Sequence, residues 1–331
     1  MTLDHRLRTS TILVTLIAAL ALLGCQAKNP APTDEAGTAS APAASSNAAG
    51  APTAEELANA TYHGIYDQPV TLVGGSWEGD PFEPGAASRP AVGLVKHFWM
   101  GGDLGGDGAE EAVVLLWESS GGTGTNNYVA AMGRHDGEIV NLGTALMGDR
   151  VQLKEARITD GKVELDVVQT GPEDAACCPS QKATRVWALD SDGLAEVASE
   201  VTGTLSVEDL GGPEWVLTHF NWDQPAPTEP EVTMVYEEGR LAGTSGCNRY
   251  TAGVEAGETA ADLVLGPAAG TRMACPEEQM AVEDRFLEQF GGVSGFGFLA
   301  GKLGLSWSLE DASGVMLFRP RERAEEGSSE G

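Results

Sequence analysis

Apolar and polar residues alternate along much of the chain between residues 54 and 200. At 163–167, Val and Leu alternate with Glu and Asp, which is the period-two pattern of a strand with one buried face. Asp160-Gly161 comes just before and favours a hairpin turn. Residues 112–117 are apolar without a break between turn residues, which indicates a buried strand. Further strands are expected at 127–132, 139–147, 151–158 and 183–189, and one short helix at 54–60.

A second series of strands is expected from about residue 203. Residues 232–236 are predicted to form a strand that ends in a turn at Glu238-Gly239. Leu, Leu, Trp and Leu occupy every second position from 303 to 309, which indicates a strand with one apolar face. Ser313-Gly314 favours a turn into another strand at 315–318, and residues 263–265 predict a short one.

One helix is predicted between these later strands. Pro276 and the acidic Glu277 and Glu278 suit the first turn of a helix. The apolar residues at 280, 286, 287 and 290 fall near one face at helical spacing, and a glycine pair at 291–292 ends the helix. We expect Glu283 and Asp284 on its solvated face.

The composition of the chain indicates where these two units begin and end. Residues 26–53 are mostly Ala, Pro, Ser, Thr and Gly, which cannot bury a core and are typical of a flexible tether. The fold class is therefore predicted as mainly β or α+β, with two antiparallel-sheet domains at 54–200 and 203–320. The charged tail from about Arg319, and residues 321–331 in particular, is expected to be disordered.

The N-terminus has the pattern of a secretory signal peptide. An apolar run from Thr11 to Leu23 follows Arg6 and Arg8 and is shorter than the roughly 20 residues that a spanning helix needs. It ends in Leu-Leu-Gly-Cys at 22–25, which resembles a bacterial lipobox. We therefore expect cleavage after residue 24, lipidation of Cys25 with a fatty acid such as palmitate, and membrane attachment through that lipid. The alternative is an ordinary signal peptide with a chance cysteine.

The charge balance excludes several kinds of partner. The chain has 49 acidic and 20 basic residues and a formal net charge of −29, which argues against nucleic acid and against docking on anionic lipid. A solvated acidic surface explains this charge more simply than a specific cationic partner. The predicted location is the cell envelope. If the organism has an outer membrane, Gln26 after the lipidated cysteine indicates attachment to that membrane, facing the periplasm.

Four cysteines remain after Cys25, and an oxidising compartment permits disulfides between them. Cys247 and Cys275 are the natural pair within one domain, and the alternative is two free buried thiols. A bond between the adjacent Cys177 and Cys178 would be strained. This second pair, followed by Pro179, is interpreted as a disulfide or a buried turn rather than a redox or zinc site.

Several separate motifs in the second unit agree in order and spacing. They are Trp-Val-Leu at 215–217, Gly-Cys-Asn at 246–248, Thr-Arg-Met-Ala-Cys at 271–275, and Glu283. Together they resemble the META domain, the HslJ-like family of bacterial envelope lipoproteins. The resemblance implies a curved antiparallel sheet crossed by one helix, and a stress-linked envelope protein without an established reaction.

The first unit resembles, more loosely, a bacterial lipoprotein domain of unassigned activity that is often found beside META. The residues that carry this likeness lie at 62–64, 103–111, 148–151 and 177–179. Within them, Asp103, Asp107 and Glu111 stand at positions one, five and nine of a calcium-type loop. Gly105 and Val114 replace two expected ligands, so we expect either a weak calcium site or a metal-free acidic turn, and no other cofactor.

The sequence has none of the G-x-S-x-G, H-E-x-x-H or Walker patterns of common enzymes. The five scattered histidines are interpreted as surface or hydrogen-bonded residues, and Trp99, Trp117, Trp215 and Trp307 as core residues. We therefore expect a non-enzymatic protein that binds or stabilises an envelope protein or an apolar ligand. The alternatives are an inhibitor of an envelope hydrolase, acting through the loop 119–127, or a pilot-like lipoprotein that holds a lipid or peptide.

Overall fold

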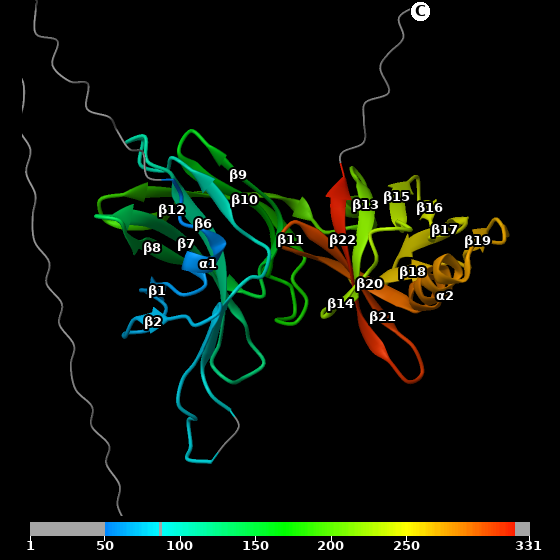
Figure 1. The fold of residues 1–331 in the computed structure, drawn as a ribbon, viewed down its shortest axis with the longest axis horizontal. Coiled ribbons are helices and arrows are strands. Elements are labelled where there is room, and N and C mark those ends of the chain that lie inside the picture. The colour runs from blue at the N-terminus through cyan, green and yellow to red at the C-terminus, as the bar shows by residue number, and fades with distance from the viewer. Residues whose placement is uncertain (1–49, 86–87, 322–331) are drawn as a thin grey trace, which may run out of the picture. The chain divides into compact units, whose positions relative to one another are not determined.

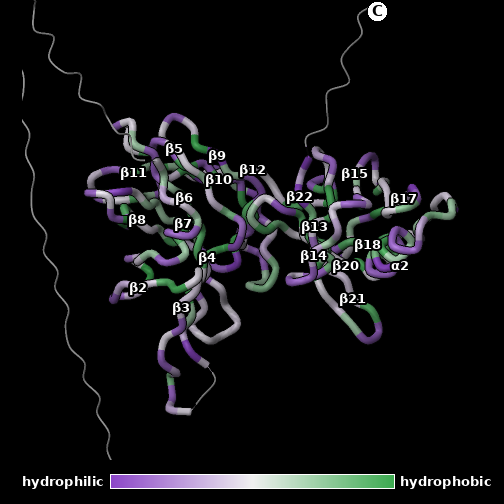
Figure 2. Tube along the Cα trace, in the orientation of Figure 1, coloured by the Kyte–Doolittle hydropathy of each residue, from purple (hydrophilic) through white to green (hydrophobic). Residues whose placement is uncertain are grey.

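The computed structural model describes residues 50–85 and 88–321 (Figure 1). The signal peptide, Cys25, most of the tether and the tail beyond Arg321 lie outside the described residues, so the predictions for them remain predictions. The described part is mostly β, its sheets are antiparallel, and it contains one main helix. Hydrophobic and hydrophilic residues are interleaved along its strands (Figure 2).

A six-stranded sheet forms the centre of the N-terminal region. Its strands run in the order β3-β4-β6-β7-β8, with β5 also paired to β6. Their bounds are β3 Ser76–Glu78, β4 Ala91–Leu94, β5 Met100–Gly102, β6 Glu111–Ser119, β7 Asn126–His135 and β8 Glu138–Asp149. Strand β6 is buried on both faces, because Val113 belongs to one hydrophobic core and Val114 to another. This double burial explains the unbroken apolar run in the sequence.

A four-stranded sheet of β9 (Gln152–Thr159), β10 (Lys162–Gln169), β11 (Gln181–Asp190) and β12 (Gly193–Thr204) shares the first of these cores. Leu165 and Trp187 are fully buried there against residues of β6 and β7. The other face of β6 packs against α1 (Ala54–Leu57), β1 (Thr61–Tyr62) and β2 (Val70–Thr71), where Tyr62 is the largest buried side chain. The expected helix at 54–60 is therefore present but shorter.

The C-terminal region is one strongly curved sheet. Its strands run in the order β18-β17-β16-β15-β13-β22-β21-β20. The sheet nearly closes, because Asp262 beside β18 forms a bridge with Gly295 of β20, and Phe296 donates a 2.8 Å backbone bond to Ala261. The bounds are η1 Val207–Leu210, β13 Glu214–Asn221, β14 Gln224–Pro225, β15 Thr233–Glu237, β16 Arg240–Thr244, β17 Arg249–Ala256, β18 Leu263–Leu265, β19 Ala269–Gly270, α2 Glu277–Gly291, β20 Val293–Leu299, β21 Lys302–Ser308 and β22 Ser313–Arg321.

Two of the three turns that the sequence predicts are two-residue hairpin turns, whereas Ser313-Gly314, also predicted as a turn, lies in β22 and pairs with β21. Asp160-Gly161 joins β9 to β10, and Glu238-Gly239 joins β15 to β16, with positive φ at all four residues. Positive φ at both central positions is the type I′ turn, whose twist matches that of the flanking strands. Glycine at the second position adopts this backbone without steric cost.

Helix α2 covers the core of the curved sheet. Phe286 and Phe290 are fully buried and each lies 5.2 Å, between ring centroids, from Tyr250 of β17. Pro276 is the N-cap residue rather than the first helical residue. Met280, expected on the apolar face, is 37% exposed, and Glu283 occupies the buried stripe instead. The expected solvation of Glu283 is therefore wrong, whereas the neighbouring Asp284 is exposed.

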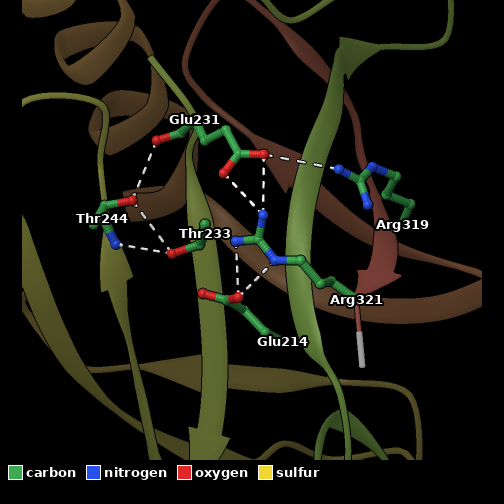
Figure 3. A network of polar contacts seen from close by, with 6 residues as sticks. All are labelled: Glu214, Glu231, Thr233, Thr244, Arg319 and Arg321. Carbon is green, nitrogen blue, oxygen red and sulfur yellow. Dashed lines mark hydrogen bonds and ion pairs between the residues drawn. The ribbon is translucent and has the colours of Figure 1, made fainter. Parts of the chain in front are cut away.

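The last strand is held by charges as well as by backbone pairing. Arg321 donates to Glu214 of β13 at 2.8 Å and to Glu231 at 2.9 Å, and Arg319 lies 3.8 Å from Glu231 (Figure 3). The hydrogen bonds that Arg321 donates to the carboxylates, first to that of Glu231 and then to that of Glu214, raise the pKa of its guanidinium. Arg319 and Arg321 therefore belong to β22, although the sequence places the start of the tail there.

Contacts also join β9 to the C-terminal sheet. Gly301 donates a 3.1 Å backbone bond to Leu153, and Phe298 donates one of 2.8 Å to the side chain of Gln152. Lys154 forms an ion pair of 2.6 Å with Asp209 of η1. Throughout the described ranges, no helix combines the length and the apolar character needed to cross a membrane.

Candidate functional site

The acidic loop between β5 and β6 uses its carboxylates on its own backbone. Asp103 accepts from the amides of Gly106 at 2.6 Å and Gly108 at 3.0 Å. Asp107 accepts from the Ala109 amide at 2.8 Å, and the buried Glu111 accepts from Leu104 at 2.7 Å. Among the described residues, no three His, Cys, Asp or Glu are grouped so that they could hold a metal ion. The structure therefore does not bring the three calcium candidates together.

The adjacent Cys177 and Cys178 are joined by a disulfide in an exposed turn between β10 and β11. The turn is exposed rather than buried. Asp174 organises it by accepting, each at 2.7 Å, from the amide of Gly171 and from both the amide and the hydroxyl of Ser180. These hydrogen bonds, led by that of Gly171, lower the pKa of the carboxyl.

A pocket of about 430 Å³ collects residues from distant parts of the chain. Part of the lining comes from residues 94–97 at and after the end of β4, together with Trp117 of β6. The rest includes His219 of β13, Trp222 just after it, and Lys302 at the start of β21. Trp222 is 57% exposed, and Trp117 is half-buried.

The charged groups of this pocket are all basic. Lys96, His97, His219 and Lys302 line it, and none of the lining residues that the structure describes is Asp or Glu. Burial lowers the pKa of Lys302. Burial, followed by the nearby Lys302 and His97, also lowers the pKa of His219. Desolvation and like charge both oppose the charged form of these groups.

A third cluster connects helix α2 to the loop between β16 and β17. The buried carboxylate of Glu283 accepts from the Ser245 hydroxyl at 2.5 Å, and from the amide and side-chain nitrogens of Asn248 at 2.7 and 2.9 Å. The side-chain oxygen of Asn248 accepts from Thr271 at 2.8 Å and from the Met273 amide at 2.7 Å. One asparagine therefore joins three separate segments of the chain.

The charge of Glu283 is stabilised by this cluster. Burial by itself raises the pKa of the carboxyl, but the hydrogen bonds from Ser245 and Asn248 outweigh it, and the net pKa is lowered. A carboxylate that accepts several hydrogen bonds favours its ionised form. Glu283 is therefore an acceptor that holds the fold, and it is unsuited to the role of a general acid.

The predicted disulfide lies beside this cluster. Cys247 is joined to Cys275, and their Cα atoms are 6.0 Å apart. Cys275 precedes the N-cap of α2, so the bond ties the start of the helix to the same loop that Glu283 binds about two turns further along. The motifs at 246–248 and 271–275 and Glu283 thus meet at one place.

Residues 208–322 match the family model of the META domain. This part of the chain is a META domain. The match begins in η1 and includes every strand of the curved sheet and α2. No curated protein matches the chain, and no solved structure does. The META domain suggests an envelope-related protein, without naming what it binds.

The sequence motifs indicate the cluster around Asn248 and Glu283, but no motif indicates the pocket. The META domain supplies His219, Trp222 and Lys302, and the region before it supplies Lys96, His97 and Trp117. Trp215 and Trp307 are buried as expected, but Trp117 lines the pocket and Trp99 is 46% exposed. No spacing rule connects residues so far apart, and only the fold places them together.

Proposed function

We propose that this chain is a lipid-anchored, non-enzymatic protein of the cell envelope that binds a partner or ligand. The sequence supports the anchor through the basic and apolar leader that ends at Cys25. The META domain supports the envelope setting. The observation that carries the binding role is the pocket lined by Trp117 and Trp222, which is in the size range of ligand sites, about 300–1,000 Å³.

The polar cluster of the META domain supports a scaffold rather than a reaction centre. Glu283 accepts from Ser245 and Asn248, and Asn248 accepts in turn from Thr271, so these polar groups serve the fold. General acid–base catalysis needs a group that reaches a substrate and exchanges a proton with it. We therefore propose that the protein acts by binding a partner or ligand and not by catalysis.

The anchor is tested by labelling cells with radioactive palmitate. The wild-type chain is expected to be labelled and to fractionate with the envelope, whereas Cys25→Ser is expected to stay uncleaved and unlabelled. Cys177→Ser serves as the matched control, because it also replaces one cysteine by serine but leaves the leader intact. Normal labelling of Cys25→Ser would show that the anchor is assigned wrongly.

Partner binding is tested by capture from detergent-solubilised envelope. The full chain, tagged at its C-terminus, is expected to retain a specific envelope component that mass spectrometry identifies. The matched bait is Trp222→Ala, which removes an exposed ring from the pocket wall. Equal recovery of background proteins on both baits, with nothing specific on either, would count against the binding role.

One observation favours hydrolase inhibition as a second candidate. The β3–β4 hairpin extends away from its sheet (Figure 1). Phe82 in this hairpin is 59% exposed, and the Ser88 hydroxyl donates at 3.0 Å to Gly121 of the β6–β7 loop. A projecting pair of loops with an exposed ring can enter an enzyme cleft. Inhibition of a peptidoglycan hydrolase by the full chain, lost in Phe82→Ser, would support this alternative.

A further inference from the structure

The pocket between Trp117 and Trp222 has a charge opposite to that of the whole chain. The chain has a formal net charge of −29, yet the pocket is lined by two lysines and two histidines and by no acidic residue that the structure describes. Within residues 50–85 and 88–321, neither Lys96 nor Lys302 forms an ion pair. Cations without counter-ions in an acidic protein are a site of positive potential for a bound anion.

Lys302 is the best placed of these cations. It is half-buried at the start of β21, and burial lowers the pKa of its amine. A partly desolvated ammonium without a partner is costly, and a charge-assisted hydrogen bond to an anion would offset that cost. The pocket therefore favours a ligand that brings a negative group to Lys302.

The remaining lining favours an apolar and flat ligand body. Trp117 lies directly against Gly93, where an added Cβ would be only 2.7 Å from the indole, so the ring rests on backbone with no side chain beneath it. Elsewhere in the lining, Trp222 is 57% exposed and Leu299 is 37% exposed. Exposed indole rings supply large apolar faces for stacking.

We propose that this pocket binds a small organic anion with a flat apolar body, such as an aromatic carboxylate. The carboxylate lies at Lys302, and the body lies between Trp117 and Trp222. The inference rests on the proposed binding function and names its ligand class. The volume of about 430 Å³ suits a small molecule rather than a folded partner.

The test compares two probes of equal shape and different charge. The full chain is placed in phosphatidylcholine nanodiscs, and 2-naphthoate and the neutral 2-naphthamide are each titrated by calorimetry, with empty nanodiscs as the background. Naphthoate is expected to bind at least about tenfold more tightly than the amide. Equal affinities, or no binding of either probe, would overturn the proposal.

Three variants tie the result to the pocket. Lys302→Met is expected to remove the preference for the anion, whereas Lys302→Arg is expected to keep it. Lys162→Met is the matched control, because it removes the same charge from an exposed position on β10. A preference that survives Lys302→Met, or that Lys162→Met removes equally, would show that the anion binds elsewhere.

The outcome for the probe and that for the envelope partner can be separated. If naphthoate fails to bind while the chain still captures a specific envelope component, the ligand class is wrong and the proposed function stands. If naphthoate binds at Lys302 and no component is captured, the pocket assignment stands and partner binding fails.

Discussion

The N-terminal region and the META domain are both antiparallel β structures, but they are held together differently. The N-terminal sheets bury apolar side chains on both faces of β6, and the loop carboxylates of Asp103 and Asp174 serve only their own turns. The META domain places a charged side chain, Glu283, in its buried helix face. The N-terminal region buries charges as well, at Glu118 of β6 and Arg185 of β11. The difference is that these charges lie on strands and bind neighbouring strands or loops, whereas Glu283 lies on the helix and fixes it to a loop of the sheet.

This difference has a physical cost and a benefit. Burying a charge is costly unless hydrogen bonds compensate it, and Glu283 accepts bonds from Ser245 and Asn248. Because such bonds are directional, they fix where α2 lies on the curved sheet. Apolar contacts, which are not directional, leave more alternatives open. The position of α2 should therefore be sensitive to single polar substitutions at Glu283 and its partners.

The largest expected effect is that of Glu283→Ala. It removes the acceptor of the Ser245 hydroxyl and of two Asn248 donors. The hydroxyl and the Asn248 side chain keep the Asn248 and Met273 carbonyls as second acceptors, whereas the Asn248 amide loses its acceptor, and an unsatisfied buried donor costs about 1–3 kcal/mol. We expect the free energy of unfolding of the META domain to fall by about 3–5 kcal/mol. This loss is measured by urea denaturation in which hydrogen exchange of the amides in β16, β17 and α2 reports unfolding of the META domain.

The control for this variant is its neighbour. Asp284→Ala removes the same charge type from an exposed position on the same helix and is expected to change stability by no more than about 0.5 kcal/mol. Similar losses in both variants would mean that the negative charge of the helix, and not the buried hydrogen bonds, is what matters.

The two disulfides provide the next test of the comparison. Cys247–Cys275 closes a loop with a separation of 28 residues, whereas Cys177–Cys178 joins neighbours. In the chain-entropy model the longer loop contributes about 3–4 kcal/mol. The replacement Cys247→Ser with Cys275→Ser should therefore lower the Tm of the META domain by many degrees, and the equivalent replacement at 177 and 178 should barely change unfolding. Calorimetry of the full chain checks both.

Local patterns were enough to predict most of this fold. The strand at 263–265 has the predicted bounds, and the alternation at 163–167 lies inside β10. Strand β20 is not predicted, because the glycines at 295 and 297 within Val293–Leu299 weaken the strand signal. Strand β12 was also missed, since nearly all of it is exposed and it lacks an apolar face to alternate.

The candidate sites also differ in whether the local sequence could predict them. The pairing of Cys247 with Cys275 and the motif order around Asn248 could be read from the chain. The burial of Glu283 could not, because its charge and its neighbour Asp284 both indicate a solvated face. The pocket could not be foreseen either, since Lys302 and Trp117 meet only through tertiary packing.

Acid should weaken the META domain through Glu283. Its folded pKa is lowered from the ordinary value of 4.5, so its contribution is fully present above about pH 4.5 and is lost as the pH falls through the folded pKa. The stability difference between the wild-type chain and Glu283→Gln should therefore shrink below pH 4.5. A difference that stays constant from pH 7 to pH 3 would show that the carboxylate charge does not contribute.

The smallest effect is expected in the acidic loop of the N-terminal region. Asp103 accepts from two exposed backbone amides, those of Gly106 and Gly108, so Asp103→Ala should cost about 1 kcal/mol. Because these oxygens already serve the loop, calcium should bind weakly at best and should not raise the Tm appreciably at millimolar concentration. Calorimetric titration of calcium into the full chain checks this. A submicromolar affinity that Asp107→Ala abolishes would show that these carboxylates bind a metal ion and do not serve only their own turn.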